Sequence, residues 1–151
     1  MKRPPDMQRL EEILRSSKIV HGGFLGDDRR PLEQILEADA AELERLGRSR
    51  EELAERMRVI TELAKAGLET SVRITDNLDA RVLDSRGVLI CPWPGEGRFT
   101  KTVVEATRRD TGKTVKWSEL NIHMIAEHGF FEGKGSDFRI EPQDLVDVIF
   151  A

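Results

Sequence analysis

The sequence of 151 residues has only one cysteine, Cys91, and this excludes an internal disulfide framework. It also lacks any apolar run that approaches the roughly 20 residues of a membrane-spanning helix. The N-terminus is charged, but it has neither the apolar segment nor the small-residue cleavage site of a secretory signal. We therefore expect a cytoplasmic protein that does not enter a membrane.

A strong excess of charge of one sign is absent as well. The net charge is −4, so the chain as a whole is not the basic protein typical of nucleic-acid binders. Apolar residues make up 38% of the chain and charged residues 34%, and Leu, Ile and Val recur at regular spacing, unlike in a disordered chain. The length is sufficient for a hydrophobic core, and we expect a folded protein.

Residues 1–68 form a helical N-terminal region in this interpretation. Apolar residues recur there at helical spacing in three segments, the second of which starts at Pro31. Ser49 and Glu52 have the spacing of a capping box, and Gly47 has the position of a glycine that ends a helix. The pattern predicts three amphipathic helices, whose apolar faces need a cover: the rest of the chain or a second subunit.

The C-terminal region has a shorter hydrophobic period, which predicts antiparallel strands. We expect three strands in a meander and two more in a hairpin closed by an Asp-Thr-Gly turn. The predicted strands are 71–75, 80–84, 88–91, 99–107 and 113–117.

Two helices complete the region of residues 69–151. Ser118 and Gly129 mark the start and the end of the first, and Pro142 opens the second. The fold class is therefore α+β, with about three N-terminal helices packed with a small antiparallel sheet and two C-terminal helices. We expect one compact unit or two tightly associated subdomains.

The first candidate site is a pair of histidines on the predicted helix after Ser118. His123 and His128 have a spacing found in zinc-finger histidine pairs. Five residues rotate about 140° around a helix, so we expect both rings to reach one ion only if the helix distorts at its end. The simpler interpretation, which we favour, is that His128 faces the negative end of the helix dipole and His123 pairs with Glu127.

The second candidate is the segment Cys91-Pro92-Trp93-Pro94-Gly95. It resembles the knuckle of a zinc ribbon, but Pro94 stands where the second cysteine of that knuckle would be. With Cys91, His123 and His128, three ligands remain, which would form an open zinc site or the remnant of a closed one. The alternative, which we favour, is that Cys91 is a small buried residue at the end of a strand.

The third candidate is the glycine-rich loop of residues 129–136. Lys134, Ser136 and Arg139 are suited to hold an anion beside it. A phosphate loop normally leads into a helix N-terminus, whereas this loop leaves a helix C-terminus. A rigid connector, anchored in the core by its two phenylalanines, is therefore favoured over a binding loop.

The fourth candidate is a basic hairpin of residues 98–116, which would meet nucleic acid or an acidic partner. The solvated face of an antiparallel sheet has a similar composition, and we favour that interpretation. The basic residues are Arg98, Lys101, Arg108, Arg109, Lys113 and Lys116.

One loop pattern occurs twice. Residues 21–26 and 128–133 both read as His-Gly, an aromatic residue and a glycine, and each is followed by a charged loop and a helix that starts at a proline. We hypothesise that the two loops frame one cleft. The polar residues around it would be His21, Asp27, Asp28, His123 and His128.

The stretch NIHMIAEHGFFEGKGSDFRIEP, with CPWPG upstream, resembles small bacterial cytosolic proteins of uncharacterised function. The resemblance covers residues from about 70 onward. It implies no activity and assigns no catalytic residue.

Three classes of function follow from these features. We favour a small cytosolic, non-catalytic binding or regulatory module with a protein partner, or with self-association through its amphipathic helices. The first alternative is a metal-dependent or histidine-based, hydrolase-like enzyme that uses Cys91, His123 and His128, with Glu127 or Glu132 as acid or base. Zinc is the expected cofactor of the metal-dependent form. The second alternative is nucleic-acid binding through the basic hairpin. No catalytic residue is assigned.

Overall fold

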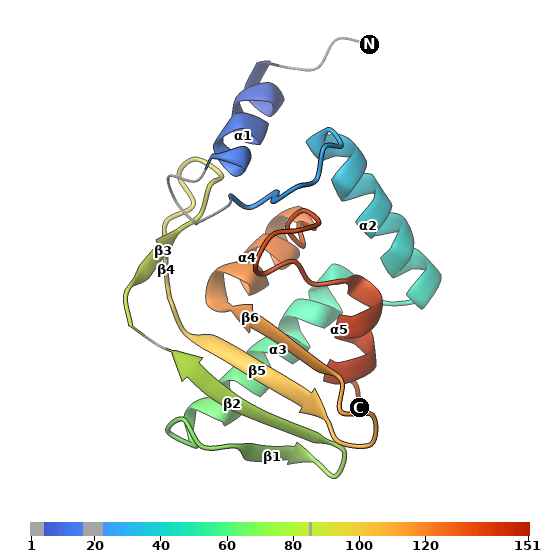
Figure 1. Cartoon of the computed structure of the whole chain (residues 1–151), viewed down its shortest axis with the longest axis vertical. Coiled ribbons are helices and arrows are strands. Elements are labelled where there is room, and N and C mark those ends of the chain that lie inside the picture. The colour runs from blue at the N-terminus through green and yellow to red at the C-terminus, as the bar shows by residue number, and fades with distance from the viewer. Residues whose placement is uncertain (1–4, 17–22, 85) are drawn as a thin grey trace.

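The computed structural model describes residues 5–16, 23–84 and 86–151, and the fold is α+β (Figure 1). The helices are α1 (Pro5–Arg15), α2 (Leu32–Leu46), α3 (Arg50–Lys65), α4 (Glu119–His128) and α5 (Pro142–Ile149). The strands are β1 (Val72–Thr75), β2 (Leu78–Asp84), β3 (Val88–Ile90), β4 (Arg98–Thr100), β5 (Val103–Arg108) and β6 (Thr114–Ser118). None of the helices in these residues combines the length and the apolar character that a membrane span requires.

The main sheet is antiparallel, with the strand order β1-β2-β5-β6. The predicted meander is wrong beyond β2, because β3 pairs with β4 in a separate two-stranded sheet and not with β2. The predicted strand 99–107 is likewise two strands, β4 and β5. Oγ1 of Thr100 accepts a hydrogen bond from the backbone N–H of Thr102 and donates one to the hydroxyl of Thr102. Such local hydrogen bonds compete with the backbone hydrogen bonds between strands at this point.

The helix ends follow the local signals in the sequence. Ser49 and Glu52 form the predicted capping box, and Gly47 ends α2 with a left-handed φ of 71°. Pro31 precedes α2 instead of being its first residue, and it provides no side-chain cap. The carboxylate of Glu11 from α1 accepts the N–H of Leu32 at 2.7 Å, so one helix caps the next.

Two hydrophobic cores lie on either side of α4. The first lies between the main sheet and α3 and α5, and it contains the fully buried Trp117. The second joins α1, α2, the loop after residue 22 and Cys91. Ile122 and Ile125 of α4 belong to the first core, whereas Leu120 and Met124 belong to the second. Because α4 is held on both sides, it is a rigid support for the two histidines that it carries.

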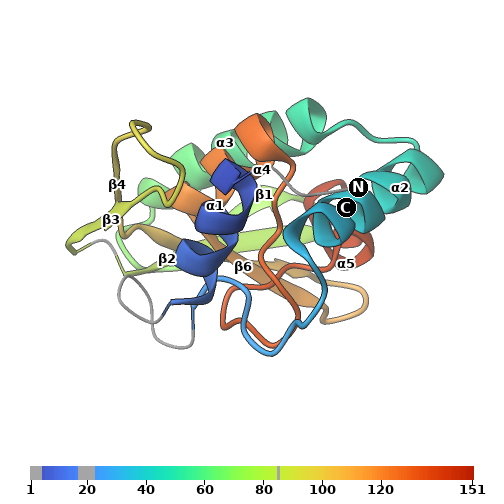
Figure 2. The same ribbon diagram turned by 90° about the horizontal axis from the view of Figure 1, so that it is seen from above.

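The β3–β4 hairpin and α2 lie at opposite ends of the molecule when it is seen from above (Figure 2). β4 contacts α4, and this contact places the turn of the hairpin beside the histidines. The turn, residues 91–97, is the segment that completes the candidate site.

Candidate metal centre

His123 and His128 converge on one carboxylate oxygen. The Nε2 atoms of the two rings donate to Oε1 of Glu96 at 2.7 and 2.8 Å. Helix α4 remains regular through His128, and only Gly129 takes a left-handed conformation. The expectation that the helix must distort was therefore wrong, because the distal ring nitrogens reach a common point beside the helix without it.

The turn of the β3–β4 hairpin brings Cys91 and Glu96 together. The backbone N–H of Cys91 donates to the carbonyl oxygen of Gly97 at 3.1 Å, which closes the turn. Sγ of Cys91 lies 4.0 Å from Oε1 of Glu96. The backbone N–H of Trp93 donates to the sulfur of Cys91, and such a bond favours the thiolate over the thiol.

The structure thus places Cys91, His123 and His128, the three predicted metal ligands, beside a fourth group. The ligand atoms of these three residues and of Glu96 all lie within 4.8 Å of one another. The sequence pattern did not predict Glu96 as a ligand, because a zinc-ribbon knuckle has its second thiolate at the position of Pro94. The sequence feature that could have identified this ligand is a carboxylate five residues after Cys91, in a turn that contains two glycines.

Aromatic side chains fix the orientation of both imidazole rings. The ring of Trp93 is stacked on that of His128, with centroids 3.9 Å apart and an interplanar angle of 5°. Phe99 lies against His123 with centroids 4.4 Å apart. Phe130 meets the edge of Trp93 from the second core. Rings that are held in this way cannot easily turn their nitrogens away from the cluster.

The electrostatics of the cluster favour one ionised acid and one neutral thiol. Burial and, to a smaller extent, the nearby charge of Glu96 raise the pKa of Cys91 to about 11, against the lowering effect of the Trp93 N–H. Desolvation opposes the ionisation of Glu96, but the hydrogen bonds from His128 and His123 outweigh it and lower the pKa of this carboxyl. A cation bound at this point would displace the thiol proton and gain a thiolate ligand.

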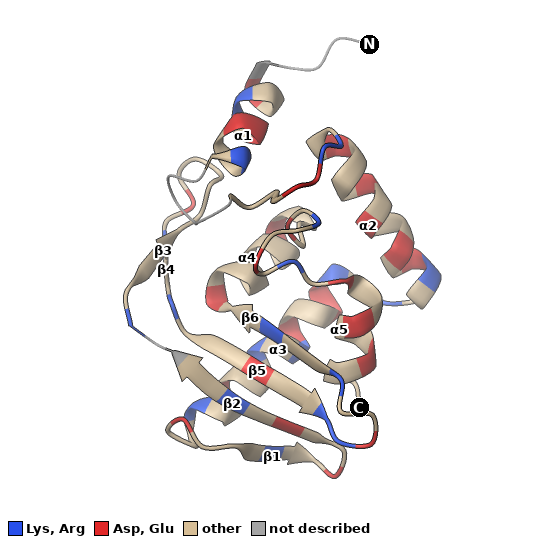
Figure 3. Cartoon of the chain, in the orientation of Figure 1, with Lys and Arg blue, Asp and Glu red and all other residues tan. Residues whose placement is uncertain are grey.

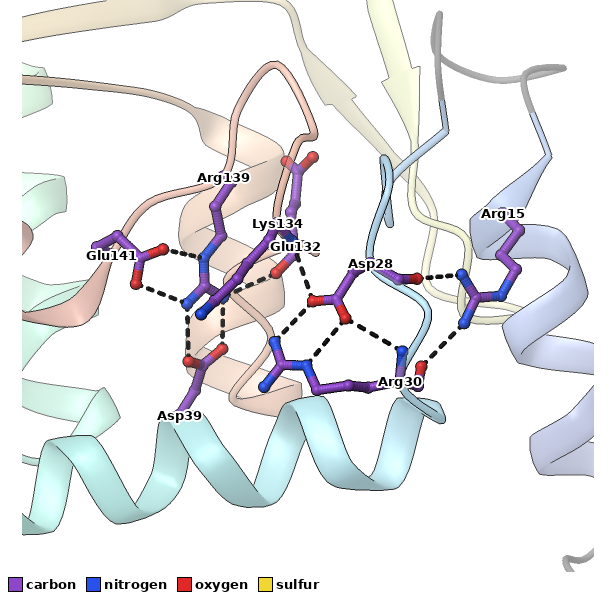
Figure 4. A network of polar contacts seen from close by, with 8 residues as sticks. All are labelled: Arg15, Asp28, Arg30, Asp39, Glu132, Lys134, Arg139 and Glu141. Carbon is purple, nitrogen blue, oxygen red and sulfur yellow. Dashed lines mark hydrogen bonds and ion pairs between the residues drawn. The ribbon is translucent and has the colours of Figure 1, made fainter.

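Two of the three predicted anion ligands, Arg139 and Ser136, have partners within the protein, and Figure 4 shows those of Arg139. Arg139 donates to both carboxylate oxygens of Asp39 at 2.6 and 2.9 Å and pairs with Glu141 at 3.0 Å. The hydroxyl of Ser136 donates to the carboxylate of Glu132. Arg139 and Asp39 are both nearly inaccessible to solvent, so this ion pair is part of the interior.

The loops of residues 23–28 and 129–136 pack directly against each other. The N–H of Gly133 donates to the carbonyl oxygen of Phe24 at 2.8 Å. A Cβ atom on Gly133 would collide with the backbone of Leu25, so only glycine permits this approach. The two loops are therefore in contact along their backbones.

Asp28, one of the residues expected around a cleft, is part of this packed region. Both of its carboxylate oxygens accept hydrogen bonds from the Arg30 guanidinium, at 2.9 and 2.6 Å, and these bonds hold its pKa well below the ordinary range. The backbone N–H of Lys134 donates to the same carboxylate at 3.1 Å. His21 lies outside the described residues.

Glu132 is a buried carboxyl between α4 and the loop that follows it. The amide of Asn121 and the hydroxyl of Ser136 donate to its two oxygens. Burial raises its pKa to about 7, although these two hydrogen bonds oppose the shift. Glu127, the other glutamate considered as an acid or base, is exposed on α4.

Three of the six residues of the basic hairpin form ion pairs with nearby carboxylates. Figure 3 shows basic and acidic residues interspersed along the strands of the main sheet. The paired cations are Arg108, Arg109 and Lys113, and their partners are Asp110, Asp79, Asp144 and Asp147.

The other three basic residues have different surroundings. The ammonium group of Lys116 lies 5.1 Å from the ring centroid of Phe138. Arg98 and Lys101 form no ion pair with any of the residues that the structure describes. Arg98 lies on β4, and Lys101 follows this strand directly. The paired cations lie near the opposite end of β5, at its C-terminus.

Comparison of the chain with protein-family models, curated proteins and solved structures gives no match in any of the three. The site is therefore interpreted from its own geometry. A thiol, two imidazoles and a carboxylate are the donor groups that zinc uses in proteins. Among the described residues, no other group of histidine, cysteine and acidic side chains gathers its ligand atoms in this way.

Proposed function

We propose that this protein is a metal-binding module in which Cys91, Glu96, His123 and His128 coordinate a zinc ion. One observation carries the proposal: four ligand atoms of the types that zinc prefers lie within 4.8 Å of one another. Two imidazoles donate to a single carboxylate oxygen of Glu96. A cation at the centre would replace these hydrogen bonds by one bond from each of the four ligands to the metal. The mixture of nitrogen, sulfur and oxygen donors disfavours magnesium and calcium.

The proposed role of the ion is to fasten the β3–β4 hairpin to α4. Cys91 and Glu96 come from the turn of the hairpin, whereas His123 and His128 come from the helix. Catalytic zinc sites usually keep one coordination position for water, but four protein ligands leave none in a tetrahedral site. This supports the non-catalytic binding or regulatory module over the hydrolase-like alternative.

We also propose a cytoplasmic location for this module. A thiolate ligand must remain reduced, and reducing compartments keep lone thiols in that state. Cys91 is the only cysteine of the sequence, so it has no internal partner for a disulfide.

The direct test is the metal content of the full chain, purified without a histidine tag. We expect one zinc per chain by elemental analysis, and we expect cobalt(II) to replace it with a thiolate-to-metal charge-transfer absorption. Replacing His128 or Cys91 by alanine should lower the affinity by more than about 100-fold in a competition with a chromophoric chelator. Glu127→Ala is the matched control, since Glu127 is exposed beside His128 and should leave the affinity unchanged.

Two results would overturn the proposal. One is a wild-type protein that neither retains zinc nor takes up cobalt. The other is metal binding that persists at the same affinity in the Cys91→Ala and His128→Ala variants.

A further inference from the structure

The β3–β4 hairpin has one face in the protein and one face in solvent. Leu89 and Phe99 are cross-strand partners, and both pack against the second core. Val88 and Ile90 point the other way, and each is 54% exposed. Arg98 is the cross-strand partner of Ile90 and lies on the same outer face. This hairpin therefore presents two aliphatic side chains next to a cation.

The outer edge of β3 also offers backbone hydrogen-bonding groups. Cys91 donates to Gly97, and the carbonyl oxygen of Gly87 accepts from Lys101, so these positions are bonded toward β4. Hydrogen-bonded positions alternate along an antiparallel strand, so the backbone groups of Val88 and Ile90 point to the opposite edge. Within the described residues, no strand pairs with that edge. An open strand edge of this kind can accept one more strand.

Two cations lie beside β3, one on β4 and the other directly after it. Arg98 and Lys101 lack ion-pair partners in the described part of the chain, in contrast to the three paired cations at the far end of β5. The side chain of Lys101 lies beside Gly87, next to the start of β3. If two copies of the chain paired through this edge, the same cations of both copies would lie near each other, so a second copy is a poor match for this surface.

We propose that the outer edge of β3 binds an extended segment of a partner protein that carries both β-branched apolar residues and acidic residues. The backbone of the segment would extend the β3–β4 sheet, and its apolar side chains would cover Val88 and Ile90. A carboxylate on that same face would pair with Arg98, and a carboxylate on the opposite face would pair with Lys101. Exposed aliphatic side chains favour a peptide over nucleic acid. Stacking on bases needs aromatic rings, and Trp93 and Phe99 are engaged with the histidines.

The docking edge rests on the proposed metal site, because β3 ends one residue before the ligand Cys91. An ion that binds the turn of the hairpin to α4 also fixes the orientation of β3. The peptide should therefore bind the zinc-loaded protein more tightly than the metal-free protein. By linkage, the peptide should raise the affinity for zinc by the same factor.

Selection from a random peptide library tests the proposal, and it does not require the partner to be identified first. The zinc-loaded full chain is used as the bait, and the enriched peptides are measured by fluorescence anisotropy. We expect enrichment of peptides that combine β-branched apolar residues with acidic residues. Affinity should fall about tenfold or more in R98E/K101E, to a lesser extent in V88T/I90T, and about fivefold on removal of zinc. R29E/R45E carries the same charge change on exposed positions elsewhere and should bind normally.

The outcomes separate the docking edge from the metal site. Zinc binding without enrichment of acidic peptides, or with equal peptide affinity in R98E/K101E and wild type, overturns the docking edge alone. Absence of zinc binding overturns the proposed function, whatever the peptides do. Binding of a labelled single-stranded oligonucleotide in place of peptides, or a dimer that V88T/I90T dissociates, would assign the edge to nucleic acid or to a second copy and would also overturn the inference.

Discussion

The cluster around Glu96 and the loop network around Arg139 both contain convergent polar side chains, but they differ in how the charges are matched. In the network, two arginines are matched by carboxylates: Arg139 has Asp39 and Glu141, and Arg30 has Asp28. In the cluster, two imidazoles and a thiol surround one carboxylate oxygen. The network is complete as it stands, whereas the cluster has an excess of donor atoms that a cation can use.

Satisfaction of hydrogen bonds does not distinguish the two regions. Among the described residues, no buried side-chain nitrogen or oxygen lacks a partner. The difference lies in the type of partner. Permanently opposite charges in a bidentate pair hold two segments together. Groups that can each lose a proton or rearrange a hydrogen bond, such as His123 and Cys91, can exchange their present partner for a metal.

The largest effect is expected from breaking the network at its buried pair. Arg139→Ala leaves the carboxylate of Asp39 buried without its partner and should lower the free energy of unfolding by about 3–5 kcal/mol. Urea denaturation measures this. Arg58→Ala removes an exposed ion pair with Glu55 at 3.7 Å and should have little effect.

If Arg139→Ala does not fold, the double variant D39L/R139M replaces both charges by apolar groups. It should recover most of the stability, since the cost arises mainly from the unpaired charge. Equal destabilisation by Arg139→Ala and Arg58→Ala, or a double variant no better than Arg139→Ala, would contradict a buried structural pair.

The second effect concerns the pH dependence of the network. The folded-state pKa of Glu132 is about 7, above the ordinary value of 4.5, so the folded state favours the protonated carboxyl. The contribution of Glu132 to stability is therefore largest at low pH and is lost as the pH rises from about 4.5 to about 7, by about 3 kcal/mol in total.

Glu132→Gln imitates the protonated carboxyl and removes this dependence. Denaturation of metal-free protein between about pH 5 and about pH 8 should show a steeper loss of stability in the wild type than in the variant. Parallel curves for the two proteins would show that Glu132 titrates normally in the folded state.

The smallest effect on stability is expected from the aromatic ring that orients His128 in the metal cluster. Trp93→Ala removes the ring stacked on His128 and should lower the stability by about 1 kcal/mol. With the imidazole less well oriented, zinc affinity should fall about tenfold. Phe138→Ala removes an aromatic ring that contacts Lys116 on the sheet, and it should leave zinc affinity unchanged. Unchanged affinity in Trp93→Ala would mean that the ring does not position His128.

Local signals predicted much of the fold. Gly47, Gly129 and the Ser49–Glu52 capping box act within one turn of chain, so their meaning does not depend on the rest of the protein. The pairing of strands was harder to predict. The break between β4 and β5 depends on side-chain bonds of Thr100 that compete with the ladder, and hydrophobic spacing does not reveal them.

The sequence by itself determined the α+β class, the ends of most helices and three of the four candidate ligands, because residue type and short-range spacing carry that information. Only the tertiary structure decided that Cys91 meets the two histidines, and that Glu96 joins them. That meeting requires β3 to leave the main sheet and its hairpin to lie against α4. The contact depends on packing between segments roughly 30 residues apart, and no pattern within either segment encodes it.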